Sequence, residues 1–217
     1  MKRKNMRKRC LTACLAASLA AFGFGGCAGV EPEMRAYPMA VSADWQNEEY
    51  VIIYGMADLP VDTGQGKDAQ ESGQEQNTGT VFRGKDMDEI HSLYDATQEY
   101  ELDLGHVQAV ILGDSLLERE EAVRYLFGYM ENSVVLGKSA YLFRMDDPSR
   151  LMELNSDGTI GNYLTGLYDN RSGAERDQPL TLENCFYEWN NYRRLPEIPR
   201  VTVEDGQIFL EKTVNEV

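Results

Sequence analysis

Two adjacent segments near residue 40 show the apolar patterns of β-strands. Residues 35–43 place alternate apolar side chains on one face, the period of two that a half-buried strand shows. Residues 50–57 are rich in β-branched and aromatic side chains, which favour a second strand. The polar residues 44–48 between them predict a turn, so the pair predicts an antiparallel hairpin.

The next segment, residues 59–80, differs in character. Four glycines stand among acidic, amide and hydroxyl side chains, and this composition predicts a disordered loop. A strand over residues 80–83 follows, and then a helix over 87–98 whose apolar residues recur at helical spacing. Asp86 is the predicted N-cap of that helix, and Glu89 follows three residues later, as in a capping box.

Residues 107–145 show the order strand, helix, strand. Residues 107–112 are nearly all apolar, which indicates a strand that is buried on both faces. A helix over 116–131 has its apolar side chains on one side, and residues 139–145 predict another strand. A helix of this length between two strands indicates a right-handed parallel crossover.

Shorter segments complete the predicted fold. We expect helices over residues 148–154, 160–168 and 182–192, and a closing hairpin of strands 200–203 and 207–210. The predicted fold class is therefore α+β: a mixed β-sheet with an N-terminal hairpin, one parallel crossover and several packing helices.

The first 26 residues have the layout of an export signal. Six basic residues among the first nine precede an apolar run over residues 10–24, and two glycines then lead to Cys27. The run is shorter than the roughly 20 residues that a membrane-spanning helix needs. A small residue followed by cysteine is typical of a lipobox, so we predict a signal peptide over 1–26 and lipidation of Cys27. The acyl chains, an amide-linked one such as palmitate among them, would give stable anchoring.

Two other interpretations of this segment stay open. One is an ordinary signal peptide with a chance cysteine, and the other is an N-terminal membrane anchor that is retained. Phe24 also stands where a lipobox usually has leucine. In the lipidated interpretation, residues 27–35 form a tether between the outer face of a bacterial membrane and the folded domain.

The charge of the chain argues against nucleic-acid binding, and its cysteine content argues against a disulfide in the mature protein. The chain has 21 basic and 36 acidic residues, and removal of the signal peptide would change the net charge from −15 to −21. Nucleic-acid binding needs a basic surface, so we expect no nucleic-acid partner. Cys10 and Cys14 leave with the signal and Cys27 carries the lipid, so Cys185 has no partner for a disulfide. Its place in a predicted helix indicates a small buried hydrophobic residue.

The candidate chemistry of the chain is sparse. His106 stands at the start of the central strand, where a structural role is favoured over ligand contact, and His91 is expected on an exposed helix face. These two histidines and one cysteine do not have the spacing of a metal site. The glycine-rich loop lacks the ending of a phosphate loop, and neighbouring acids point apart. We therefore predict no catalytic residue, no metal, no cofactor and no enzymatic activity.

The order of these features resembles one family. A lipobox cysteine, a strand pair, a variable glycine-rich loop and Gly84 before an acidic helix start are followed by residues 104–114, LGHVQAVILGD. This block is similar to the signature of the Ger(x)C family, the C-subunit lipoproteins of spore germinant receptors, in their N-terminal domain. Gly105, His106 and Gly113 are the matching motif positions, and we expect them to be structural. The resemblance covers about residues 27–212.

The resemblance also implies a division of the chain. Residues 36–196 would form the family's N-terminal α/β domain, and residues 197–217 a C-terminal hairpin that starts a truncated second domain. Ala28 and Gly29 follow the cysteine where the family usually has tryptophan and aspartate. Family members are longer, so we expect a truncated paralogue, one part of a split gene or an incomplete reading frame.

The implied function is that of a non-enzymatic, membrane-anchored lipoprotein subunit of a spore germinant receptor, which responds to small nutrients. Its partners would be the integral-membrane receptor subunits, met by protein–protein contacts on the outer face of the spore inner membrane. The alternative is a stand-alone surface lipoprotein that binds a small ligand or a cell-wall component. A remnant without function also stays open.

Overall fold

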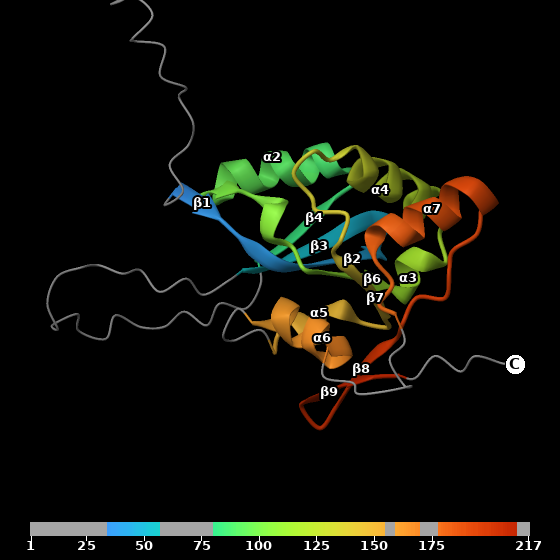
Figure 1. Cartoon of the computed structure of the whole chain (residues 1–217). Coiled ribbons are helices and arrows are strands. Elements are labelled where there is room, and N and C mark those ends of the chain that lie inside the picture. The colour runs from blue at the N-terminus through green and yellow to red at the C-terminus, as the bar shows by residue number, and fades with distance from the viewer. Residues whose placement is uncertain (1–33, 57–79, 155–158, 170–177, 212–217) are drawn as a thin grey trace, which may run out of the picture. The chain divides into compact units, whose positions relative to one another are not determined.

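The centre of the fold is a five-stranded mixed sheet (Figure 1). The computed structural model describes residues 34–56, 80–154, 159–169 and 178–211. The strands lie in the order β4 (Thr80–Gly84), β3 (Glu49–Met56), β2 (Pro38–Gln46), β6 (Ala109–Gly113) and β7 (Tyr141–Met145). β2, β3 and β4 pair antiparallel, whereas β6 pairs parallel with both β2 and β7. The predicted fold class, with its hairpin and its parallel crossover, is confirmed.

The first hairpin closes through a two-residue turn. Asn47 and Glu48 have φ angles of 53° and 65°, and two successive positive φ angles are the mark of a type I′ turn. The predicted turn over residues 44–48 was therefore too long, because β2 continues to Gln46. The longer strand carries Asp44 into the sheet, where it is buried.

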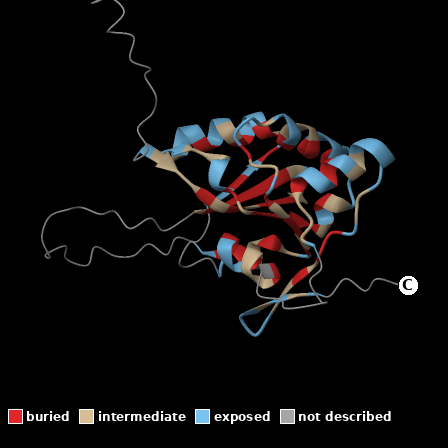
Figure 2. Cartoon of the chain, viewed as in Figure 1, coloured by how far each residue is buried: buried red, intermediate tan, exposed pale blue. Residues whose placement is uncertain are grey.

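Helices cover both faces of the sheet (Figure 1). One face packs against α2 (Met87–Thr97), α4 (Glu120–Asn132) and α7 (Leu182–Tyr192). The other face packs against α5 (Pro148–Met152), α6 (Ile160–Asp169) and the C-terminal hairpin. Figure 2 shows the strands between these layers as mostly buried. Side chains of β6 enter the buried clusters on both sides, as its continuous apolar sequence predicts.

The start of α2 agrees with its capping sequence. Asp86 Oδ1 accepts a hydrogen bond from Glu89 N at 2.8 Å, so Asp86 is the N-cap. The Glu89 carboxylate accepts a hydrogen bond from Lys85 N at 2.8 Å, one residue before the usual partner in a capping box. Met87 N donates to the Tyr125 hydroxyl at 3.1 Å, so three of the backbone N–H groups around this helix start are satisfied by side chains.

The predicted crossover helix over 116–131 is broken into two helices. A short helix, α3 (Asp114–Leu117), precedes α4, and Arg119 between them has φ −112° and ψ 88°, outside the helical region. Leu116 and Val123 lie on opposite sides of the break and enter the same buried cluster. Because a seven-residue spacing also places two side chains on one face of a continuous helix, the apolar pattern did not reveal the break.

The C-terminal hairpin packs against the main sheet. Its strands, β8 (Val201–Glu204) and β9 (Gln207–Leu210), pair antiparallel around Asp205 and Gly206, whose φ angles are 50° and 75°. Val201 is fully buried in the cluster that contains α5 and α6. The hairpin therefore contributes to the core of the described domain, and a domain boundary after residue 196 stays a prediction.

A small sheet lies where the described chain begins. β1 (Arg35–Ala36) pairs parallel with β5 (Glu101–Leu102), and the 3-10 turn η2 (Leu104–His106) then leads toward β6. The predicted signal peptide, Cys27 and the glycine-rich loop lie outside the described residues. None of the helices in the described part of the chain has the length and apolar character needed to span a bilayer.

Candidate functional site

Charged side chains gather at the carboxyl ends of the parallel strands, the edge where ligand sites usually form in open α/β sheets. Asp114 follows β6 directly, and its Oδ2 lies 2.7 Å from Arg200 Nη2. Its Oδ1 lies 3.8 Å from Arg144 Nη1, an ion pair that is too long for a hydrogen bond. Arg200 Nε is also 3.8 Å from Glu211 Oε1. The first residue of α3, a residue of β7 and the two residues that flank the C-terminal hairpin thus meet in one charged cluster.

A cleft of about 420 Å³ opens beside this cluster. Asp114, Leu117 and Glu118 line it together with Arg144 and residues 195–198, which mix carboxylates, one guanidinium and aliphatic side chains. No serine, cysteine or histidine is among the described residues that line it. The cleft is therefore suited to binding a small polar molecule or a partner's segment by ion pairing and apolar contact.

Gly113, one of the predicted motif positions, is packed beneath the side chain of Asp44. Asp44 is 5% exposed and lies one residue beyond the Ala43–Leu112 pair of the β2–β6 register. A Cβ built on Gly113 would overlap the Asp44 carboxylate. Gln46 Nε2 donates to Asp44 Oδ2 at 3.1 Å, while the buried Oδ1 has no hydrogen-bond partner among the described residues. This close approach requires a residue without a side chain at position 113.

Gly105 and His106 lie at the other end of β6. His106 is exposed, and its ring meets the ring of Tyr37 edge-on, with centroids 4.7 Å apart. Gly105 N donates to Asp103 Oδ1 at 2.9 Å. This bond is the main cause of the lowered pKa of Asp103, and a bond from Arg35 adds to it. The motif positions therefore belong to opposite ends of one strand, and the structure does not bring them together in a single site.

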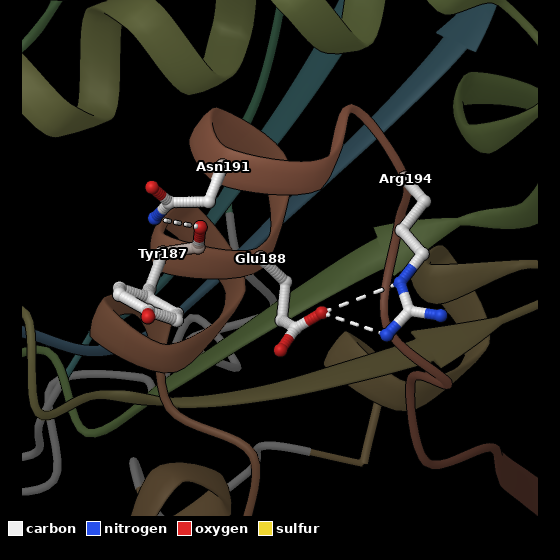
Figure 3. A network of polar contacts seen from close by, with 4 residues as sticks. All are labelled: Tyr187, Glu188, Asn191 and Arg194. Atoms are coloured by element: carbon white, nitrogen blue, oxygen red, sulfur yellow. Dashed lines mark hydrogen bonds and ion pairs between the residues drawn. The ribbon is translucent and has the colours of Figure 1, made fainter.

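The exposed face of α7 and the residues that follow it carry aromatic and charged side chains (Figure 3). Arg194 donates from Nε and Nη2 to Glu188 Oε2, at 3.3 and 3.1 Å, and its guanidinium lies 5.5 Å from the ring centroid of Tyr192. Asn191 Nδ2 donates to the Tyr187 carbonyl at 2.8 Å. Both tyrosines are more than half exposed. Tyrosine and arginine are enriched at the energetic centres of protein interfaces, so this face is a candidate contact surface.

Comparison with known families identifies the domain. The family model described as spore germination protein N-terminal domain matches residues 29–203. The chain belongs to this family. The resemblance to the N-terminal domain of the Ger(x)C family is thereby confirmed. No curated protein and no solved structure matches the chain.

The matched span of the germination domain contains the cleft and the face of α7. It runs from two residues after Cys27 to the third residue of β8, and so includes Asp114, Arg144 and Arg200. Sequence reasoning placed Asp114 directly after a buried strand, but it did not single out the two arginines. One feature of the sequence could have located the charged cluster: an acidic residue directly after a parallel strand lies at the carboxyl edge of the sheet, where ligand sites usually form.

Other titratable candidates of the germination domain have structural surroundings. Cys185 is fully buried, and that burial raises the pKa of its thiol to about 12, which agrees with the predicted small hydrophobic residue. His91 is less exposed than predicted, and its Nε2 lies 2.6 Å from the Tyr129 hydroxyl. Within the described residues, no group of three histidine, cysteine or acidic side chains is placed to hold a metal ion.

We expect Cys185 to react very slowly with maleimides in the folded domain. The thiolate is the reactive form, and burial both raises the pKa of the thiol and blocks access to it. In a mature chain carrying Cys27→Ser, labelling followed by mass spectrometry should be on the order of 100-fold slower than in guanidinium chloride. Equal rates in the two conditions would contradict the buried position of Cys185.

Proposed function

We propose that this chain is a non-enzymatic, lipid-anchored subunit of a spore germinant receptor. The observation that carries the proposal is the match to the germination domain over residues 29–203. The match begins two residues after Cys27, which is where the mature chain would begin if the lipobox is processed. In this proposal the domain works by contacts with integral-membrane receptor subunits, on the outer face of the spore inner membrane.

Two features support action through contacts rather than chemistry. Asp114, which lines the cleft, is already paired, since its carboxylate lies 2.7 Å from Arg200 and 3.8 Å from Arg144. The face of α7 presents Tyr187 and Tyr192 to solvent, 59% and 56% exposed. Rigid aromatic side chains on a helix give large contact area at low entropic cost, which suits a protein partner.

The proposal is tested by deleting the gene in its source organism and following spore germination with a panel of nutrients. We expect a selective loss of one nutrient response, while germination triggered by calcium dipicolinate stays intact, because that trigger does not need a nutrient receptor. Complementation with the intact gene should restore the response. Normal germination with every nutrient would contradict the receptor role.

One observation favours a second candidate, a stand-alone surface lipoprotein. The cleft of about 420 Å³ has both charged and aliphatic lining, which suits a small ligand or a fragment of cell wall. Neighbouring genes separate the two functions: genes for integral-membrane receptor subunits beside this one favour the receptor, and their absence favours the stand-alone lipoprotein.

A further inference from the structure

An exposed apolar tip lies in the turn between α4 and β7. Val134 is 99% exposed and Val135 is 54% exposed, while the following residue, Leu136, is 6% exposed and belongs to the core. Scattered exposed apolar side chains are normal on a protein surface. Two adjacent aliphatic side chains at the end of a turn instead form a small apolar surface to which a lipid or protein partner can bind.

The turn that displays the valines is held by several hydrogen bonds. Lys138 Nζ donates to the carbonyl of Met130, in the last turn of α4, and to that of Ser133, the C-cap of the helix. Ser133 Oγ accepts a hydrogen bond from Leu136 N at 3.2 Å. A cation at the carboxyl end of a helix is also favoured by the helix dipole. The valines therefore lie on a turn that is fixed by hydrogen bonds and is joined to the core by Leu136.

This tip is continuous with the place where the described chain begins. A Cβ built on Gly105 would lie 3.8 Å from Val135 Cγ1, so η2 and the tip lie side by side. Gly105 bonds to Asp103, which in turn lies 2.7 Å from Arg35 in β1. Figure 1 shows β1 at one end of the sheet and α3 at the other. The tip, η2 and β1 thus form one surface, which we term the amino edge.

The chain between the predicted lipid and the amino edge is short. Six residues lie between Cys27 and Met34, where the description of the domain starts, so the two are at most about 25 Å apart when this chain is fully extended. A lipid at Cys27 would therefore hold the amino edge close to the membrane at a high effective concentration. Under that condition the bilayer is the apolar phase that the exposed valines would meet first.

We propose that Val134 and Val135 dip into the lipid interface, so that the amino edge of the sheet faces the membrane. This inference rests on the proposed lipid anchor at Cys27. The tip has neither the basic side chains of an electrostatic membrane site nor the exposed tyrosines of α7, so apolar contact with lipid is the interaction that its chemistry supports. The cleft at the carboxyl ends then faces away from the lipid and is open to partners.

The experiment uses the lipidated full-length mature chain on neutral phosphatidylcholine vesicles. Val134→Cys is labelled with an environment-sensitive nitrobenzoxadiazole dye, and the label is selective because Cys185 is buried and Cys27 carries the lipid. The matched control is Tyr192→Cys, at an exposed position at the end of α7. We expect severalfold brighter, blue-shifted emission from the Val134 probe only, with quenching by spin-labelled lipids.

Flotation of the same samples reports separately on the anchor. Protein that floats with the vesicles while the Val134 probe stays in a water-like environment would overturn the membrane-facing tip and leave the anchor intact. Protein that does not float would overturn both. A probe that shifts only after an integral-membrane protein is added to the vesicles would show a protein contact, and this too would overturn lipid insertion.

A label-free variant checks the same inference without a dye. Val134→Asp combined with Val135→Asp should fold normally, since both side chains are exposed, and should float as the parent chain does. On vesicles, amide hydrogen exchange over residues 133–137 should slow severalfold in the parent and be unchanged in the variant. Equal protection in the two chains would contradict a role for the valines.

Discussion

Replacing Gly113 by alanine is expected to lower the free energy of unfolding by about 1–3 kcal/mol, the usual cost of overpacking a well-packed core. The new methyl group would overlap the carboxylate and the Cβ of Asp44, a buried side chain that would have to shift. Urea denaturation of the mature chain carrying Cys27→Ser measures the change, and the slope with urea should stay the same.

The control is another glycine in a regular element, Gly128 in α4. A Cβ at this position meets no atom within 4 Å. Gly128→Ala is therefore expected to raise the free energy of unfolding by roughly 0.5–1 kcal/mol, because alanine loses less conformational entropy in a helix. If the two substitutions change the free energy of unfolding equally, close packing of Gly113 against Asp44 is not the cause of the loss.

A double-mutant cycle identifies the colliding group. In an Asp44→Ser background the carboxylate is gone, so Gly113→Ala should cost clearly less than in the parent. Residues in direct contact show such non-additivity, whereas distant ones do not. If the cost of Gly113→Ala is the same in both backgrounds, the collision lies elsewhere.

Replacing Cys27 by serine is expected to release the chain from the membrane. Serine cannot carry the thioether-linked diacylglyceryl group, and loss of the acyl chains removes the anchoring that two or more chains provide. We expect the membrane-bound fraction of the expressed protein to fall by at least about tenfold. Fractionation with immunoblotting measures this fall, and metabolic labelling with an alkyne fatty acid should disappear with it.

Cys185→Ser is the matched control for that experiment, since it removes the other cysteine of the mature chain. Cys185 is fully buried, so its replacement should leave both membrane association and fatty-acid labelling unchanged. Cys27→Ser protein that stays in the membrane fraction would instead support an N-terminal anchor that is retained.

Local patterns predicted most elements of the fold correctly. The predicted helix over 182–192 coincides with α7, and the strands on either side of the crossover pair parallel as expected. Such patterns succeed where the signal is contained within one turn of helix or one strand. The prediction failed at residue 44, where β2 continues to Gln46. A polar residue after an apolar strand is also the pattern of a turn, so the sequence did not show that Asp44 is buried within the strand.

Candidate-site residues divide in the same way. Gly113 stood out as a motif position, but the reason for the glycine is the Asp44 side chain, which reaches it from a neighbouring strand. His106 also stood out, and it lies exposed against Tyr37 at the other end of β6. The motif therefore marked two residues with different surroundings. Only the tertiary structure shows that Gly113 packs under Asp44 while His106 lies exposed against Tyr37.

By itself, the sequence determined the mixed α/β class, the central position of β6, the buried character of Cys185 and the family to which the chain belongs. These features depend on apolar periodicity and on motif order, which are local properties. Tertiary structure alone decided that Asp114 meets Arg144 and Arg200, and that the valine tip adjoins η2 beside β1. Such contacts follow from strand register and helix packing between distant segments, and no local pattern encodes them.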